Sequence, residues 1–195
     1  VKIMALRFGL DVVSEVRAIN FARQNGVKII NASFSGPGFS QAEYDAIEAF
    51  QNAGGIFVAA ASNEGTNNDT APYYPASHDL PGIISVAATN QLDELASFSN
   101  FGVSSVDVGA PGANIAGLLI ANQYGYLSGT SMAAPHVAGL AALITATYPE
   151  LTSTQIKSLI LNTGDSLSSL QNKTLTGKRV NAYLSLIHIS EPTRL

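Results

Sequence analysis

Apolar residues recur along this chain in two alternating patterns, a helical spacing of three or four residues and short continuous runs that are typical of buried strands. The apolar positions between Val12 and Ile19 mark one face of a helix that ends at Gly26. The strand-like run 27–32 follows directly. This opening predicts one helix–strand unit.

The same order of elements then repeats. Ser40 and Glu43 have the spacing of a capping box, which predicts a helix that continues through Gln51 and ends at Gly54. The apolar run 56–61 indicates a second buried strand. The pattern also predicts strands at 83–88 and 106–110 and helices at 131–148 and, behind a capping box of Thr152 and Gln155, 153–162; residues 1–8 have the composition of a strand.

Strands that alternate with helices predict an α/β fold, in which a mostly parallel central sheet is covered by helices on both faces. The polar, turn-rich stretch 62–82 is long for a connection inside a compact domain, so we expect it to be a functional loop.

The composition excludes several classes of function. Charged residues make up 12% of the chain, against about 25% in an average soluble domain. The net charge is -4 and there is no basic cluster, which argues against a nucleic-acid partner. The absence of Cys excludes disulfides, thiolate metal sites and a Cys nucleophile. The longest apolar stretch, 132–148, is interrupted by Pro135 and His136, so we expect no membrane span.

Candidate chemistry is concentrated in the segment GTSMAAPHVAG, residues 129–139. Ser131 stands where the 131–148 helix begins, and unpaired N–H groups at a helix N-terminus favour negative charge that develops beside a hydroxyl. The segment is not the G-x-S-x-G elbow of α/β-hydrolases, because Ala133 stands where the second Gly is required. The structural alternative is an Ala-rich core helix that happens to begin with Ser.

This segment closely resembles the nucleophile motif of subtilisin-like serine proteases (subtilases), and the resemblance extends to Tyr183. It implies a three-layer subtilisin-like fold whose N-terminal part is missing, with residues 1–183 as a partial peptidase domain. The implied activity is that of a serine endopeptidase that forms an acyl-enzyme on polypeptide substrates. The resemblance further implies a secreted protein that is a monomer when complete.

The segment AAASNEGT, residues 59–66, resembles the part of the family that donates to the oxyanion, and the donor here is Asn63. An uncharged amide can rest near a neutral carbonyl and strengthen its bond as charge appears. Without the neighbouring motif, an Asx-turn after a strand would explain a lone Asn equally well.

The resemblance also implies a substrate groove. An extended peptide would pair with the backbone of residues 33–35, a form of strand addition. Ser35 stands where the family commonly has Gly, which would narrow the groove, and Tyr73 near the pocket floor would favour modest apolar side chains; amphipathic surface packing explains Tyr73 and Tyr74 as well. The implied substrate-binding residues are Ser33, Phe34, Ser35, Gly36, Ala60, Ala61, Ser62, Tyr73 and Thr130.

No cofactor is required for this chemistry. Asp107 resembles a family position that can bind structural calcium together with main-chain carbonyls from the loop near Pro81, and hard oxygen ligands suit calcium. The alternative is that Asp107 is a turn or capping residue at a strand end.

The sequence offers no obvious base for Ser131. His136 lies five residues later on the same helix, about 140° around its axis. His78 lies in a polar loop where surface or turn placement is expected, and His188 lies near the end of the chain. In the subtilisin order Asp and His precede Ser, so we expect both upstream of Val1 and the chain alone to be inactive. A pseudoprotease or peptide-binding module is the alternative for the parent protein.

The final segment LSLIHISEPTRL, residues 184–195, resembles the translation of a transposon end used to build sequencing libraries. We therefore expect residues 184–195 to be a non-native, adapter-derived tail. The alternative is a natural helix end followed by a frayed tail.

Overall fold

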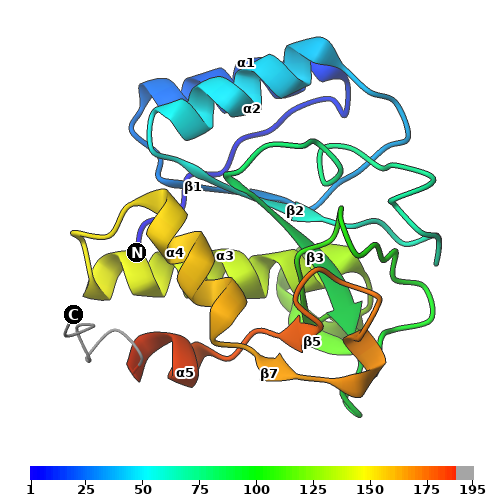
Figure 1. Ribbon diagram of the computed structural model, residues 1–195. Coiled ribbons are helices and arrows are strands. Elements are labelled where there is room, and N and C mark those ends of the chain that lie inside the picture. The colour runs from blue at the N-terminus through cyan, green and yellow to red at the C-terminus, as the bar shows by residue number, and fades with distance from the viewer. Residues whose placement is uncertain (188–195) are drawn as a thin grey trace.

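The computed structural model describes residues 1–187 of the chain. Six strands form one sheet in the order β1-β2-β3-β4-β8-β7, and every neighbouring pair is parallel except β7 with β8 (Figure 1). A separate antiparallel hairpin pairs β5 with β6. The strand bounds are Ile29–Ala32 (β1), Ile56–Ala60 (β2), Ile83–Thr89 (β3), Val108–Pro111 (β4), Ile115–Leu119 (β5), Gln123–Leu127 (β6), Asp165–Ser166 (β7) and Lys178–Arg179 (β8).

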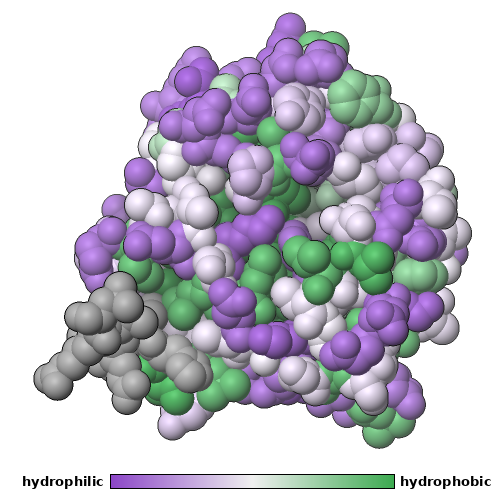
Figure 2. All heavy atoms as spheres, viewed as in Figure 1, coloured by the Kyte–Doolittle hydropathy of each residue, from purple (hydrophilic) through white to green (hydrophobic). Residues whose placement is uncertain are grey.

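Helices cover both faces of the sheet, as Figure 1 shows. Helices α1 (Val12–Gln24) and α2 (Gln41–Asn52) lie on one face, and α3 (Thr130–Thr147) crosses β1 to β4 on the other. Helix α4 (Ser153–Asn162) packs against α3, and the short α5 (Ala182–Ile187) follows β8. Hydrophilic side chains cover the upper edge of the face seen in Figure 2, over α1 and α2. This arrangement confirms the predicted three-layer α/β fold.

Local capping explains where two of these helices begin. The Thr152 hydroxyl accepts from the Gln155 N–H and the Gln155 side chain accepts in return, which completes the predicted capping box of α4. Ser40 likewise caps α2 by accepting from the Glu43 N–H. The Glu43 carboxylate, however, turns inward to His78, so the predicted box at α2 is only half formed.

One expectation about local structure was wrong, and one pair of strands was not foreseen. Residues 1–8 have strand composition but form no strand, and in the structure they lie beside a cavity of about 840 Å³ between α1, β1 and α3. The hairpin of β5 and β6 was not predicted, because its exposed Leu118 and Tyr124 break the alternation that identifies a half-buried strand. None of the helices within residues 1–187 is long and apolar enough to cross a membrane.

The segment predicted to be foreign lies partly within the described residues. Residues 184–187 complete α5, where Ser185 is buried and its hydroxyl lies 2.7 Å from that of Thr163. Residues 188–195, which include His188, lie outside the described residues. The origin of this segment stays a prediction.

Candidate active site

Ser131 lies in the first turn of α3, which begins after Gly129. Its N–H therefore has no acceptor within the helix and points out of the helix end. Two reciprocal hydrogen bonds join Ser131 to Ser33, the residue directly after β1. The Ser131 hydroxyl donates to the Ser33 carbonyl at 3.0 Å, and the Ser33 hydroxyl donates to the Ser131 carbonyl at 2.9 Å. The helix N-terminus is thus fixed against a strand that lies 98 residues earlier.

Asn63 lies at the carboxyl end of β2, beside this helix terminus. Its Oδ1 accepts from the Thr130 N–H at 2.8 Å and from the Thr130 hydroxyl at 3.1 Å. These two bonds fix the orientation of the amide, and its Nδ2 has no hydrogen-bond partner among residues 1–187, so it can donate to a ligand. Ser62, the preceding residue, is buried and has a φ of 95°, a conformation that non-glycine residues rarely adopt and that recurs at functional sites.

The walls of the expected groove are tied to the same point. The Ser35 hydroxyl donates to the Ser62 hydroxyl at 2.7 Å, and the Ser62 N–H donates to the Thr130 hydroxyl at 3.2 Å. Gly36 exchanges two backbone hydrogen bonds with Tyr74, of 2.9 and 2.7 Å. The strand-to-loop segment after β1 and the segment after β2 therefore converge on the start of α3.

The other expected groove residues lie close to these in the chain. Ala60 and Ala61 are buried where β2 ends, and the Phe34 ring packs against the ring of Phe8 with centroids 4.8 Å apart. Tyr73 is half-buried and its N–H donates to the Ser77 hydroxyl. The substrate-binding role of all of these residues stays a prediction.

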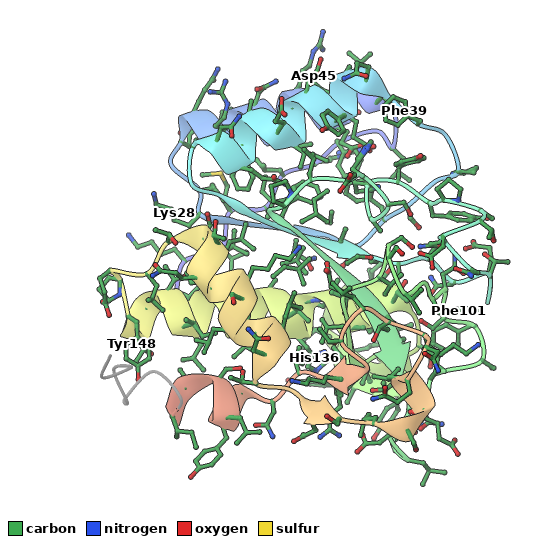
Figure 3. All side chains as sticks on the ribbon, in the orientation of Figure 1. Lys28, Phe39, Asp45, Phe101, His136 and Tyr148 are labelled. Atoms are coloured by element: carbon green, nitrogen blue, oxygen red, sulfur yellow. The ribbon has the colours of Figure 1, made fainter. Side chains whose placement is uncertain are left out.

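Neither histidine within residues 1–187 contacts the Ser131 hydroxyl. His136, labelled in Figure 3, is exposed, and its Nδ1 lies 2.8 Å from the Met132 carbonyl of its own helix. His78 ends a turn, as expected, because its N–H donates to the Pro75 carbonyl at 3.1 Å. The expected surface placement was wrong, because its side chain is fully buried and its Nε2 lies 2.6 Å from the Glu43 carboxylate. A polar loop sequence concealed this partner, which comes from a helix 35 residues earlier.

The buried Glu43–His78 pair lies behind the groove wall, an arrangement that the sequence did not reveal. The His78 ring packs against the Tyr74 ring with centroids 4.6 Å apart, and Tyr74 carries the backbone bridge to Gly36. Glu15 of α1 is also buried, and its carboxyl lies close enough to Glu43 for the two groups to interact. Burial, reinforced by the nearby Glu43 charge, raises the pKa of Glu15 to about 8 from 4.5.

We expect Glu15→Gln to remove a pH-dependent loss of stability. The Glu15 carboxyl loses its proton near pH 4.5 in the unfolded chain but keeps it up to about pH 8 in the folded protein. The stabilisation that comes from the protonated carboxyl is therefore full below pH 4.5 and is lost as the pH rises through 8. Denaturant unfolding followed across this range should show the variant roughly 2 kcal/mol more stable than the wild type at the alkaline end, once solvent screening is allowed for. Glu48→Gln on the exposed face of α2 is the control. If the wild type and Glu15→Gln lose the same stability as the pH rises, the assignment of this loss to Glu15 is wrong.

Asp107, the residue expected to bind calcium, has its carboxylate already engaged. One oxygen accepts from the Ser85 N–H at 2.8 Å, and the other lies 3.6 Å from the ammonium of Lys157. Calcium needs six to eight oxygen ligands, and no group of three or more acidic, His or Cys side chains that could hold a metal occurs in the described part of the chain. In this structure the Asp107 carboxylate is paired with Lys157, and calcium binding at this position stays a prediction.

Comparison with known proteins shows which family the chain is similar to. The profile of the subtilase family matches residues 1–181. The chain is 38% identical over 178 residues to a thermophilic serine proteinase of Bacillus sp. (strain AK1), an alignment that covers 91% of this chain and 42% of that protein. It is 39% identical over 153 residues to subtilisin DY of Bacillus licheniformis, covering 78% of this chain and 55% of the relative. The chain thus spans about half the length of these relatives.

Solved structures give the same result. The prenylagaramide maturation protease PagA superposes with a TM-score of 0.80 at 26% identity, over 94% of this chain and 69% of that one. A protease of Pseudoalteromonas arctica PAMC 21717 superposes with a TM-score of 0.79 at 29% identity, over 90% of this chain and 58% of that one. Because the family profile matches nearly the whole length and the superposed proteases share the fold, the chain belongs to the subtilase family.

Proposed function

We propose that the protein to which this chain belongs is a serine endopeptidase in which Ser131 is the nucleophile. The observation that carries the proposal is the clamp between Thr130 and Asn63. Two hydrogen bonds from Thr130 hold Asn63 Oδ1, which leaves Nδ2 as a free donor beside the free N–H of Ser131. Two neutral donors fixed beside a hydroxyl are what the oxyanion of a tetrahedral intermediate needs.

The substrate would be an extended polypeptide. Its backbone would pair with residues 33–35, and its scissile carbonyl would lie against Ser131 with the oxygen toward Asn63. Before attack, the Ser131 hydroxyl must turn from the Ser33 carbonyl, its hydrogen-bond partner in this structure, toward the substrate and a base. Attack then forms the acyl-enzyme, and water releases the acyl group in a second step.

A serine hydroxyl is a poor nucleophile without a base, and the base needs an acid to orient it. Since neither His78 nor His136 reaches Ser131, we propose that the catalytic His and Asp come from outside residues 1–187. The chain by itself is then inactive. An extracellular location is part of the proposal and is supported by the similarity to the subtilisins of Bacillus.

A second candidate is a peptide-binding module without catalysis. The reciprocal hydrogen bonds between Ser131 and Ser33 favour it, because in this arrangement the hydroxyl serves a structural contact and has no base beside it. The groove would then hold an extended peptide that is never cleaved.

Labelling of the full-length gene product with a serine-directed fluorophosphonate tests the proposal. We expect the full-length protein to be labelled, Ser131→Ala to abolish labelling, and the 195-residue chain alone to remain unlabelled. Ser128→Ala, which alters an exposed serine three residues earlier, should leave labelling intact. Labelling that survives Ser131→Ala would show that the nucleophile is wrong. A full-length protein that binds peptides but is not labelled would support the second candidate.

A further inference from the structure

A pocket of about 660 Å³ lies away from Ser131, between the loop that precedes β3, the segment that leads into β4, and helix α4. Lys157 of α4 enters this pocket from the side. Its ammonium donates to the Ile83 carbonyl and lies 3.6 Å from Asp107 Oδ1. The Lys157 and Asp107 side chains are only 18% and 14% exposed, so the two charges face each other largely out of water.

Every polar atom of Asp107 has a partner within the protein. Its Oδ2 accepts from the Ser85 N–H, and its backbone N–H donates to the Ser85 carbonyl at 2.9 Å. Its carbonyl accepts from both the N–H and the hydroxyl of Thr176. Burial raises the pKa of the Asp107 carboxyl, and the charge of Lys157 opposes that effect. An anion held in this way needs a fixed positive charge beside it.

The lysine leaves no place for a metal ion on this carboxylate. A calcium ion at about 2.3–2.6 Å from Asp107 Oδ1 would lie within a few ångströms of the ammonium, and two positive charges at that distance repel. Three nearby carbonyls are also engaged. That of Ile83 accepts from Lys157, and those of His78 and Leu80 accept backbone N–H groups.

We propose that the ammonium of Lys157 is the resident cation of this pocket. Its positive charge links α4 to the Asp107 carboxylate, directly before β4, and to the carbonyl of Ile83, the first residue of β3. The Asp107 carboxylate therefore has its counter-charge without calcium, and the stability of this part of the chain does not depend on calcium at this pocket. Removal of the lysine charge exposes Asp107 and the Ile83 carbonyl, two oxygen ligands of the kind that calcium binds.

Thermal unfolding of the 195-residue chain in calcium chloride and in EGTA tests this proposal, with isothermal titration of calcium as a direct measure of binding. The wild-type Tm should be the same in both buffers. Lys157→Gln keeps much of the length of the side chain but removes its charge, so its Tm in EGTA should fall by roughly 5–10 °C, as for the loss of one partner of a largely buried ion pair. Calcium should restore part of that loss and should bind the variant more tightly than the wild type.

Two further variants serve as controls. Lys157→Arg keeps the charge and should remain insensitive to calcium, and Lys28→Gln removes an exposed lysine and should behave as the wild type. A wild-type Tm that rises with calcium as much as that of Lys157→Gln would overturn the proposal, as would a Lys157→Gln variant that neither loses stability nor binds calcium. If Lys157→Gln is unfolded in EGTA, folding on addition of calcium supports the proposal and failure to fold contradicts it.

Discussion

Asn63→Leu in the full-length enzyme should lower kcat by about 10²- to 10³-fold, a range taken from removal of the corresponding donor in subtilisin itself. KM should change little, because the amide bonds the carbonyl oxygen strongly only when negative charge develops on it. Steady-state kinetics on a chromogenic peptide separate the two constants. Leucine has nearly the size of asparagine, but it lacks both the N–H donor and the oxygen that accepts from Thr130.

A second substitution at this position isolates the donor. Asn63→Asp preserves an oxygen that can accept from Thr130 but supplies no N–H and places a negative charge beside the oxyanion. We expect it to lose at least as much activity as the leucine variant. Asn52→Leu, on the exposed end of α2, is the control and should leave kcat unchanged. A large rise in KM with an unchanged kcat for Asn63→Leu would show that this residue binds the ground state instead.

Gly112→Ala should destabilise the fold by roughly 1–3 kcal/mol, the usual cost of overpacking a well-packed region. A Cβ at this position would lie 2.5 Å from the Ala88 Cβ, 2.9 Å from the Gly129 carbonyl oxygen and 3.1 Å from the Ala133 Cβ. These are backbone or short side-chain atoms, so none can turn away. Urea unfolding measures the loss of stability.

The same substitution should also impair catalysis in the full-length enzyme. Gly129 donates to the Gly112 carbonyl and directly precedes α3, so any shift at Gly112 moves Ser131 relative to Asn63. A displacement of about 1 Å can cost about 10²-fold in rate. Gly117→Ala in the exposed hairpin, where a Cβ would meet nothing within 4 Å, is the matched control. Equal stabilities of the Gly112 and Gly117 variants would disprove the packing argument.

The sequence predicted the elements whose signals are local. The apolar runs of β2 and β3 and the capping box before α4 can each be recognised within a few residues. The structure confirms these elements with shifts of at most one position at the ends. Residues 1–8 have a local strand signal as well, but they form no strand, since strand composition forms a strand only where a neighbouring strand offers its backbone. Tertiary pairing, which local patterns cannot specify, decided that segment.

Contacts between distant segments were beyond sequence reasoning. The motifs pointed to Ser131 and Asn63 as candidates, but only the fold shows that Thr130 joins them. A buried partner for His78 and an ammonium beside Asp107 depend on where α2 and α4 pack against the loops around the sheet. Side chains on separate elements meet through packing, which residue type and spacing do not encode.

The position of α3 in the chain has a consequence for how the protein acquires its structure. Strands β1 to β4 pair in the order in which they are synthesised, each parallel to the one before it. The helix that covers one face of all four follows only at Thr130–Thr147. Until then, that face of the growing sheet exposes its apolar side chains and risks association with other chains. Docking of this late helix covers that face of the sheet and brings Ser131 to Ser33, so a nascent or partly folded chain carries no assembled nucleophile.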